Sequence, residues 1–136
     1  ILGNVRRNME RDFAAAYCDD AGVMRCIAAT WEEKKYLIDP HTAVAMDVLN
    51  QYRKSTGDHT PALVVSTASP FKFCPAVLEA LGSQCSTQGL ESIVQLEKRT
   101  GLQAPAPLTN LVGKPVRFQN VIGKDDMASA VRAMLE

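Results

Sequence analysis

Apolar residues recur at helical spacing in the first part of the chain. Every fourth residue is apolar in the stretch after Asn4, which predicts a helix capped by Asn4 with one buried face. A second helix is expected to begin at Asp19 and Asp20, because negative charge suits a helix N-terminus. Asp39 followed by Pro40 predicts a third helix, since aspartate caps helices and proline fits their first position. The apolar positions of these helices are Val5, Met9, Phe13 and Tyr17, then Ala21, Met24, Ile27, Ala28 and Trp31, then Val44, Val48, Leu49 and Tyr52.

Residues 63–65 break the helical pattern with three consecutive apolar side chains, two of them β-branched. Such a short, non-alternating run is typical of a strand buried on both faces of a parallel sheet. Ser69 and Pro70 then predict the cap and the first residue of another helix. Ser66 and Thr67 would lie where the strand ends, beside that helix N-terminus. Because open α/β sheets bind ligands at this place, the pair is the first candidate for a functional site.

The second half of the chain predicts two more helices and one more strand. A polar loop is expected at 83–89, a helix at 90–100, an extended surface crossing at 103–115, a strand at 116–122 and a last helix from 123 onward. The fold class is therefore α/β, with about six helices and two strands. Since two strands alone make a poor sheet, we expect further strands from residues outside this chain. The side chains expected to face inward are Phe73, Val77, Leu78, Leu81, Ile93, Val94, Met127, Val131, Met134 and Leu135.

Charge and composition point away from nucleic acids and membranes. The 15 basic and 15 acidic residues balance, so the chain has no charge excess that favours an anionic partner. We expect no membrane span, since no apolar run is long enough for one, and we expect a cytoplasmic protein. The sequence begins at Ile1 rather than at methionine, from which we expect a fragment of a longer polypeptide.

The titratable residues show no common catalytic or metal-binding signature. The four cysteines lack C-x-x-C spacing and no histidine lies near a pair of them, so no metal site is expected. Cys26 and Cys74 are expected as small buried hydrophobes. His41 stands just inside a predicted helix, where a structural role is the more common one. Lys72 lies between two phenylalanines, which would suit a desolvated amine, but at the start of a helix we expect it to point to solvent.

Two stretches resemble the signatures of a known enzyme family. Residues 38–45 read Ile-Asp-Pro-His-Thr-Ala-Val-Ala, and residues 66–73 read Ser-Thr-Ala-Ser-Pro-Phe-Lys-Phe. They are similar, in the same order, to the D-P-H-T-A and S-T-A-H-P-x-K-F motifs of threonine synthases. Residues 13–20, with Tyr-Cys-Asp-Asp, are similar to a segment upstream of those motifs. Most of the chain thus resembles the C-terminal part of threonine synthase.

The resemblance implies a fold, a reaction and a cofactor. Threonine synthases are pyridoxal-phosphate-dependent lyases with the tryptophan-synthase-like fold (fold type II), and they convert O-phosphohomoserine and water into threonine and phosphate. Residues 1–136 would be a helix-rich C-terminal fragment of the cofactor-binding region, with a few parallel strands of a larger sheet. Thr67 matches the threonine whose hydroxyl contacts the pyridine nitrogen. The further candidates around the cofactor are Ser66, Asp39, His41 and Thr42.

The chain also departs from the family pattern. Ser69 stands where the family usually has histidine, and Lys72 matches the helix lysine of the second motif rather than the Schiff-base lysine. That lysine and the family's phosphate-binding loop have no match here. We therefore expect the intact parent to be the enzyme, and the fragment alone neither to bind pyridoxal phosphate nor to turn over substrate.

Two other classes of function fit the residues. A free-standing α/β module could bind a phosphorylated metabolite, without catalysis, at the strand end and the helix N-terminus of Ser69. An interaction domain could instead pair an exposed sheet edge with a partner chain.

Overall fold

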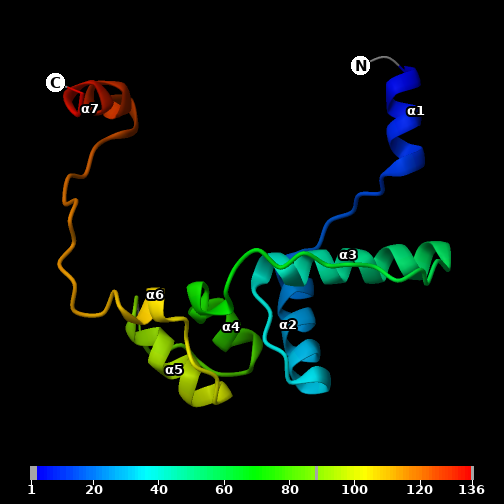
Figure 1. Ribbon diagram of the computed structural model, residues 1–136, viewed down its shortest axis with the longest axis horizontal. Helices are drawn as coiled ribbons and strands as arrows, with labels where there is room; N and C mark the ends of the chain where they lie inside the picture. Colours follow the sequence, from blue (N-terminus) through cyan, green and yellow to red (C-terminus); the bar gives the residue numbers. More distant parts are fainter. Residues whose placement is uncertain (1–2, 88, 136) are drawn as a thin grey trace.

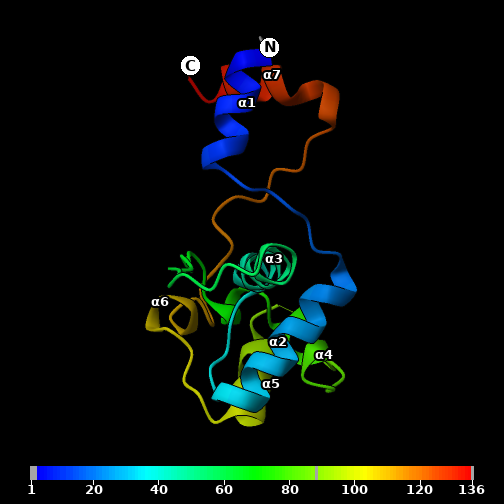
Figure 2. The same ribbon diagram turned by 90° about the vertical axis from the view of Figure 1, so that its right-hand side faces the viewer.

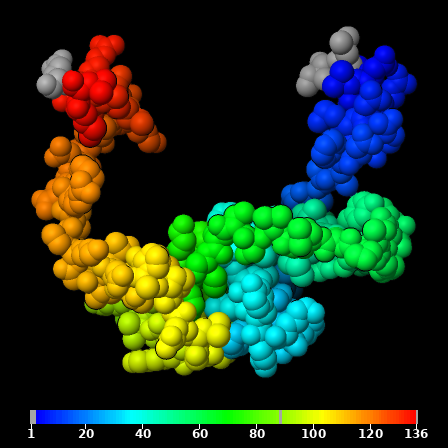
Figure 3. Space-filling model, in the orientation of Figure 1, coloured from blue at the N-terminus to red at the C-terminus, as the bar shows by residue number. Residues whose placement is uncertain are grey.

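Helices make up the regular structure of this protein in the computed structural model, which describes residues 3–87 and 89–135. Figure 1 shows a central body that holds α2 to α6, while the first and last helices lie beyond it, each at the end of an extended stretch. Figure 3 shows the same two stretches as separate projections from the body. The α-helices are α1 (Gly3–Asp12), α2 (Asp20–Lys34), α3 (Pro40–Thr56), α4 (Cys74–Ala80), α5 (Glu91–Thr100), α6 (Ala106–Thr109) and α7 (Met127–Ala133), and the 3₁₀ helices are η1 (Pro70–Lys72) and η2 (Lys124–Asp126).

The hydrophobic core lies where α2, α4 and α5 meet the start of α3. Ile27 of α2, Leu78 of α4 and Leu96 of α5 are all fully buried. Of the inward positions expected for the helix at α4, Val77, Leu78 and Leu81 are buried and Phe73 is half-buried. Val94, expected to face inward, is exposed, and Leu96 of α5 takes its place in the core. The other buried apolar residues are Val23, Leu37, Ile38, Ala43, Phe71, Cys74 and Ile93.

The predicted helix starts in the central body are confirmed. The Asp19 side chain caps α2 by accepting a hydrogen bond from the Gly22 N–H at 2.7 Å. Asp39 caps α3 in the same way, with Pro40 as the first helical residue. Gly57 ends α3 in the left-handed conformation, with a φ of 72°, which glycine adopts without steric cost.

The strand predicted at 63–65 is wrong. The described part of the chain contains no strand, and residues 57–69 form an irregular stretch. Leu63 is 91% exposed and Val65 68%, so the side chains expected in a sheet interior are open to solvent. A strand forms only when a neighbouring strand pairs with it, and within the described residues none lies beside this stretch.

The predictions for the two ends of the chain also need correction. The first helix stops at Asp12, its capping by Asn4 is wrong because the helix begins at Gly3, and its apolar stripe is not buried. The strand predicted at 116–122 is absent, and its apolar side chains are exposed. The last helix forms, but as η2 followed by α7, without a buried residue. Figure 2 shows both terminal helices on the same side of the central body, clear of its core.

Two predictions about the middle of the chain are changed by the structure. Ser69 caps η1, a 3₁₀ helix of three residues, and α4 begins only at Cys74. The crossing at 103–115 contains the short helix α6, where an extended stretch was expected. The helix-rich part of the expected fold class is confirmed, whereas its strands are not present in the described residues. Among those residues, no helix has the length and hydropathy needed to cross a membrane.

Candidate functional site

The N-terminus of α3 holds a buried carboxylate. Asp39 is fully buried, and one of its oxygens accepts hydrogen bonds from the backbone N–H groups of His41 at 2.9 Å and Thr42 at 3.3 Å. Its other oxygen accepts a hydrogen bond from the Thr42 hydroxyl. Burial raises the pKa of Asp39, but the donors from Thr42 and His41 outweigh it and hold the pKa below its usual value. The carboxylate is therefore kept ionised by groups from the first turn of its own helix.

Ser66 joins this carboxylate from far along the chain. Its Oγ lies 2.9 Å from Oγ1 of Thr42 and 3.5 Å from Oδ2 of Asp39. Four of the five predicted site residues, Asp39, His41, Thr42 and Ser66, thus share one hydrogen-bond network. The sequence predicted that both stretches border one site, but it did not predict that these side chains contact each other.

His41 and Phe73 provide a second contact between the two motifs. The imidazole and phenyl rings pack edge to face, with their centroids 5.1 Å apart. The Nδ1 atom of His41 also lies 3.2 Å from Oδ1 of Asp39, which favours the tautomer that carries its proton on Nδ1. The imidazole borders a hollow of about 710 Å³ whose lining includes Val23 and Glu79. Sequence analysis missed Phe73 as part of this site, although it belongs to the second motif.

Thr67 follows Ser66 directly but is not part of this network. Side chains of an extended segment alternate between its two sides. Ser66 and Thr67 are both exposed, but the Ser66 hydroxyl contacts α3, and by this alternation we expect the Thr67 side chain to point away from that helix. The same alternation holds upstream, where Leu63 and Val65 are exposed and Val64 is half-buried. Thr67 is thus exposed, like Leu63 and Val65 at the alternate positions before it.

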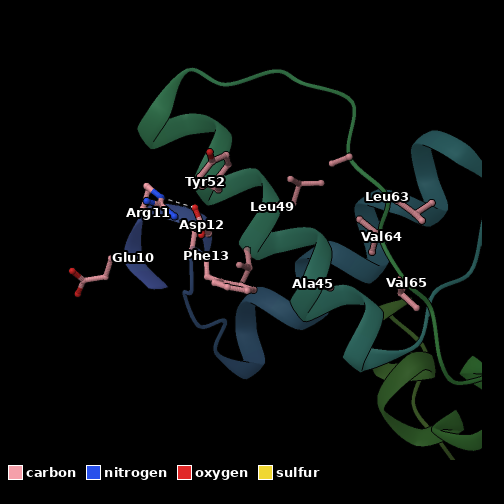
Figure 4. A pocket seen from close by; sticks show the side chains of 13 residues that line it. Glu10, Arg11, Asp12, Phe13, Ala45, Leu49, Tyr52, Leu63, Val64 and Val65 are labelled. Carbon is pink, nitrogen blue, oxygen red and sulfur yellow. Dashed lines mark hydrogen bonds and ion pairs between the residues drawn. The ribbon is translucent and has the colours of Figure 1, made fainter. Parts of the chain in front are cut away.

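An apolar groove runs between α3 and the segment that leads to the site. It has a volume of about 620 Å³, and Figure 4 shows Phe13 reaching toward α3 at one end and Leu63 to Val65 lying along the other. The face of α3 that was expected in the core supplies Val48, Leu49 and Tyr52 to this groove instead. These α3 side chains are half-buried, so the central body leaves this side of the helix partly open.

The remaining candidate groups lie apart from one another. Lys72 is exposed on η1, as expected. Cys74 is buried, Cys26 is half-buried, and all four cysteines are free thiols. Within residues 3–87 and 89–135, histidine, cysteine and acidic side chains form no group of three that could hold a metal ion. The phosphate site considered at Ser69 loses its basis, since a three-residue 3₁₀ helix lacks the aligned N–H groups and dipole of a longer helix.

Comparisons with known proteins point to one family. Residues 42–134 match the family model described as "Threonine synthase, C-terminal". The chain is 39% identical over 87 residues to a threonine synthase of Methylobacillus glycogenes, which covers 61% of this chain and 18% of that protein. It is 36% identical over 78 residues to a threonine synthase of Corynebacterium glutamicum, covering 57% of this chain and 16% of that protein.

A mammalian relative shows a similar degree of likeness. The protein "Threonine synthase-like 1" of Mus musculus is 35% identical over 74 residues, which covers 54% of this chain and 10% of the relative. The matched region therefore accounts for between a tenth and a fifth of the length of each of these three relatives.

Proposed function

Since this chain belongs to the threonine synthase C-terminal family, we propose that it is part of an enzyme that converts O-phospho-L-homoserine and water into L-threonine and phosphate. The intact protein would carry out the reaction with pyridoxal phosphate. The present chain would supply one wall of the cofactor site, and polypeptide outside it would supply the lysine that binds the cofactor covalently.

One observation supports the proposal most directly. The two motifs that carry the family resemblance, residues 38–45 and 66–73, lie at one place in the fold. Thr42 and Ser66 bring their hydroxyl oxygens to 2.9 Å, and His41 packs on Phe73. Residues more than 20 positions apart need no such contact if they serve only their own helices. Their meeting at the N-terminus of α3 is the arrangement expected of a shared site.

The outward hydroxyl of Thr67 fits the pyridine nitrogen of pyridoxal phosphate, because an exposed hydroxyl can donate to an aromatic nitrogen. When bound, the cofactor supplies an electron sink for a carbanion. A carboxylate beside the ring nitrogen would hold it protonated, whereas a neutral hydroxyl leaves the ring a weaker sink. That moderation suits elimination and replacement chemistry. Thr67 would thus hold the pyridine ring in place and keep it a moderate electron sink.

The other candidates would act around Thr67. Asp39 is fully buried and bonded to its own helix, so it would support the site rather than touch the cofactor. His41 has an exposed ring whose Nε2 is available for a hydrogen bond. Lys72 would not be the amine that binds the cofactor, because it is exposed on a helix of three residues with nothing there to desolvate it.

Substitution of Thr67 tests the proposal in the full-length protein. Thr67→Val removes the hydroxyl with little change of shape, and we expect kcat to fall about tenfold or more, as for a lost hydrogen bond to a reacting group. Helix content should stay the same. Thr60→Val is a matched control, since Thr60 is an exposed threonine upstream in the same stretch. An unchanged kcat/KM for Thr67→Val would contradict the proposed contact.

A further inference from the structure

We propose that Thr42 and Asp39 are positioning residues, which hold Ser66 against α3 and thereby determine that Thr67 faces outward. This role rests on the one proposed above for Thr67, because a fixed direction matters only if the Thr67 hydroxyl has a ligand. It is carried by the hydrogen-bond network and the alternation of side chains. No contact of Thr67 itself is needed.

The hydrogen bonds among Asp39, Thr42 and Ser66 anchor residues 57–69, a segment with few other contacts. Residues 57–69 form no helix or strand, and their apolar side chains are mostly exposed. The anchor on the helix side is rigid by comparison. Asp39 is fully buried and accepts from two backbone N–H groups, so the orientation of its carboxylate is set by α3. Thr42, also buried, extends that fixed point to the hydroxyl of Ser66.

A single anchor is enough to set the direction of the neighbouring residue. In an extended segment the side chains alternate, so a shift of one residue exchanges the two sides. If Thr67 replaced Ser66 beside Thr42, its hydroxyl would be turned to α3 and lost to any ligand outside. Both residues carry hydroxyls, and so the chemistry of the anchor alone would accept either. We infer that the exposed Leu63 and Val65 disfavour the shift, because Val64 fits the α3 side better as a half-buried residue.

The test uses NMR on the isotope-labelled 136-residue chain. Thr42→Val removes the hydroxyl, Thr42→Ser keeps it, and Ser66→Ala removes the other partner without touching the core. Thr30→Val is the matched control, because Thr30 is a buried helical threonine whose hydroxyl donates to the Cys26 carbonyl oxygen at 2.7 Å. The readouts are the backbone order parameters of residues 64–68 in every variant and, where residue 42 carries a γ-methyl, the NOE between that methyl and the β-protons of residue 66.

We expect order parameters near 0.85 at Ser66 and Thr67 in the unchanged chain and below about 0.6 in Thr42→Val and Ser66→Ala. Thr42→Ser and Thr30→Val should keep the higher values. Unchanged order in both Thr42→Val and Ser66→Ala would overturn the positioning role, and so would an equal loss in Thr30→Val. Because this readout involves no cofactor, it separates the two proposals. If Thr67→Val leaves the enzyme activity unchanged, the proposed cofactor contact is wrong. The positioning role of Thr42 and Asp39 is decided by the order parameters alone.

Discussion

Asp39 and Asp19 both cap a helix, but they should differ in what they contribute to stability. Asp19 is exposed and accepts one hydrogen bond, from the Gly22 N–H. Its replacement by alanine should cost about 1 kcal/mol, the usual value for a lost cap. Asp39 is fully buried and serves the N–H groups of His41 and Thr42 as well as the Thr42 hydroxyl. Asp39→Ala loses the cap, the acceptor of a second backbone N–H and the buried acceptor of the Thr42 hydroxyl, which keeps only Ser66 Oγ as a partner; these losses cost a further 1–3 kcal/mol or so. We expect a total of about 3 kcal/mol.

Urea unfolding of the two alanine variants measures this difference. Circular dichroism follows the helices, and the single tryptophan, Trp31 in α2, provides a second probe. The dependence of the unfolding free energy on urea should stay the same in both variants, so that the midpoints report stability alone. If Asp39→Ala costs no more than Asp19→Ala, the buried network adds nothing to the cap. Ser66 would then have no rigid anchor on α3 either.

Three further results follow from burial and charge. Leu78→Ala should lower the unfolding free energy by about 2–5 kcal/mol because Leu78 is fully buried, whereas Leu63→Ala, at a 91% exposed site, should change it by less than about 0.5 kcal/mol in urea titrations. The lowered pKa of Asp39 stabilises the fold at pH values above the pKa of about 4 that an aspartate has in the unfolded chain, and this stabilisation is lost as the pH falls through the lowered pKa. The unfolding free energy of Asp39→Asn should therefore decline less steeply on acidification than that of the unchanged chain. Burial, followed by Asp47, raises the pKa of Cys18 to about 11, so its alkylation should be slow at pH 8 and accelerate about tenfold per pH unit, and a fast reaction at pH 8 would contradict this environment.

In the central body, the helix starts set by neighbouring residues were predicted well, whereas the cap predicted at Asn4 was not. The caps at Asp19 and Asp39 need only a few adjacent residues to form their hydrogen bonds. The inward positions of α4 were also correct, since a helix with apolar residues on one side buries that side. Local patterns therefore predicted the framework around the site.

Features that need a distant partner were predicted poorly. Residues 63–65 have the composition of a buried strand, yet a strand needs another strand beside it, and the described residues offer none. The contact of Thr42 with Ser66 joins residues 24 positions apart, and no periodicity in the sequence indicates it. The apolar stripes of α1 and α7 are exposed for the same reason. Their amphipathic patterns predict a buried face, but the central body does not cover either helix.

The open apolar stretches have a consequence for handling this chain. Leu63, Val65 and Val121, which is 96% exposed, stand on extended backbone whose N–H and C=O groups are free of a sheet. Backbone of this kind forms ladders with copies of itself, and β-branched neighbours favour the stacking. We expect the purified chain to form oligomers as its concentration rises, with a sedimenting mass that grows accordingly. A lysine in place of Val65 or Val121 should keep it monomeric to higher concentration without a loss of helix content.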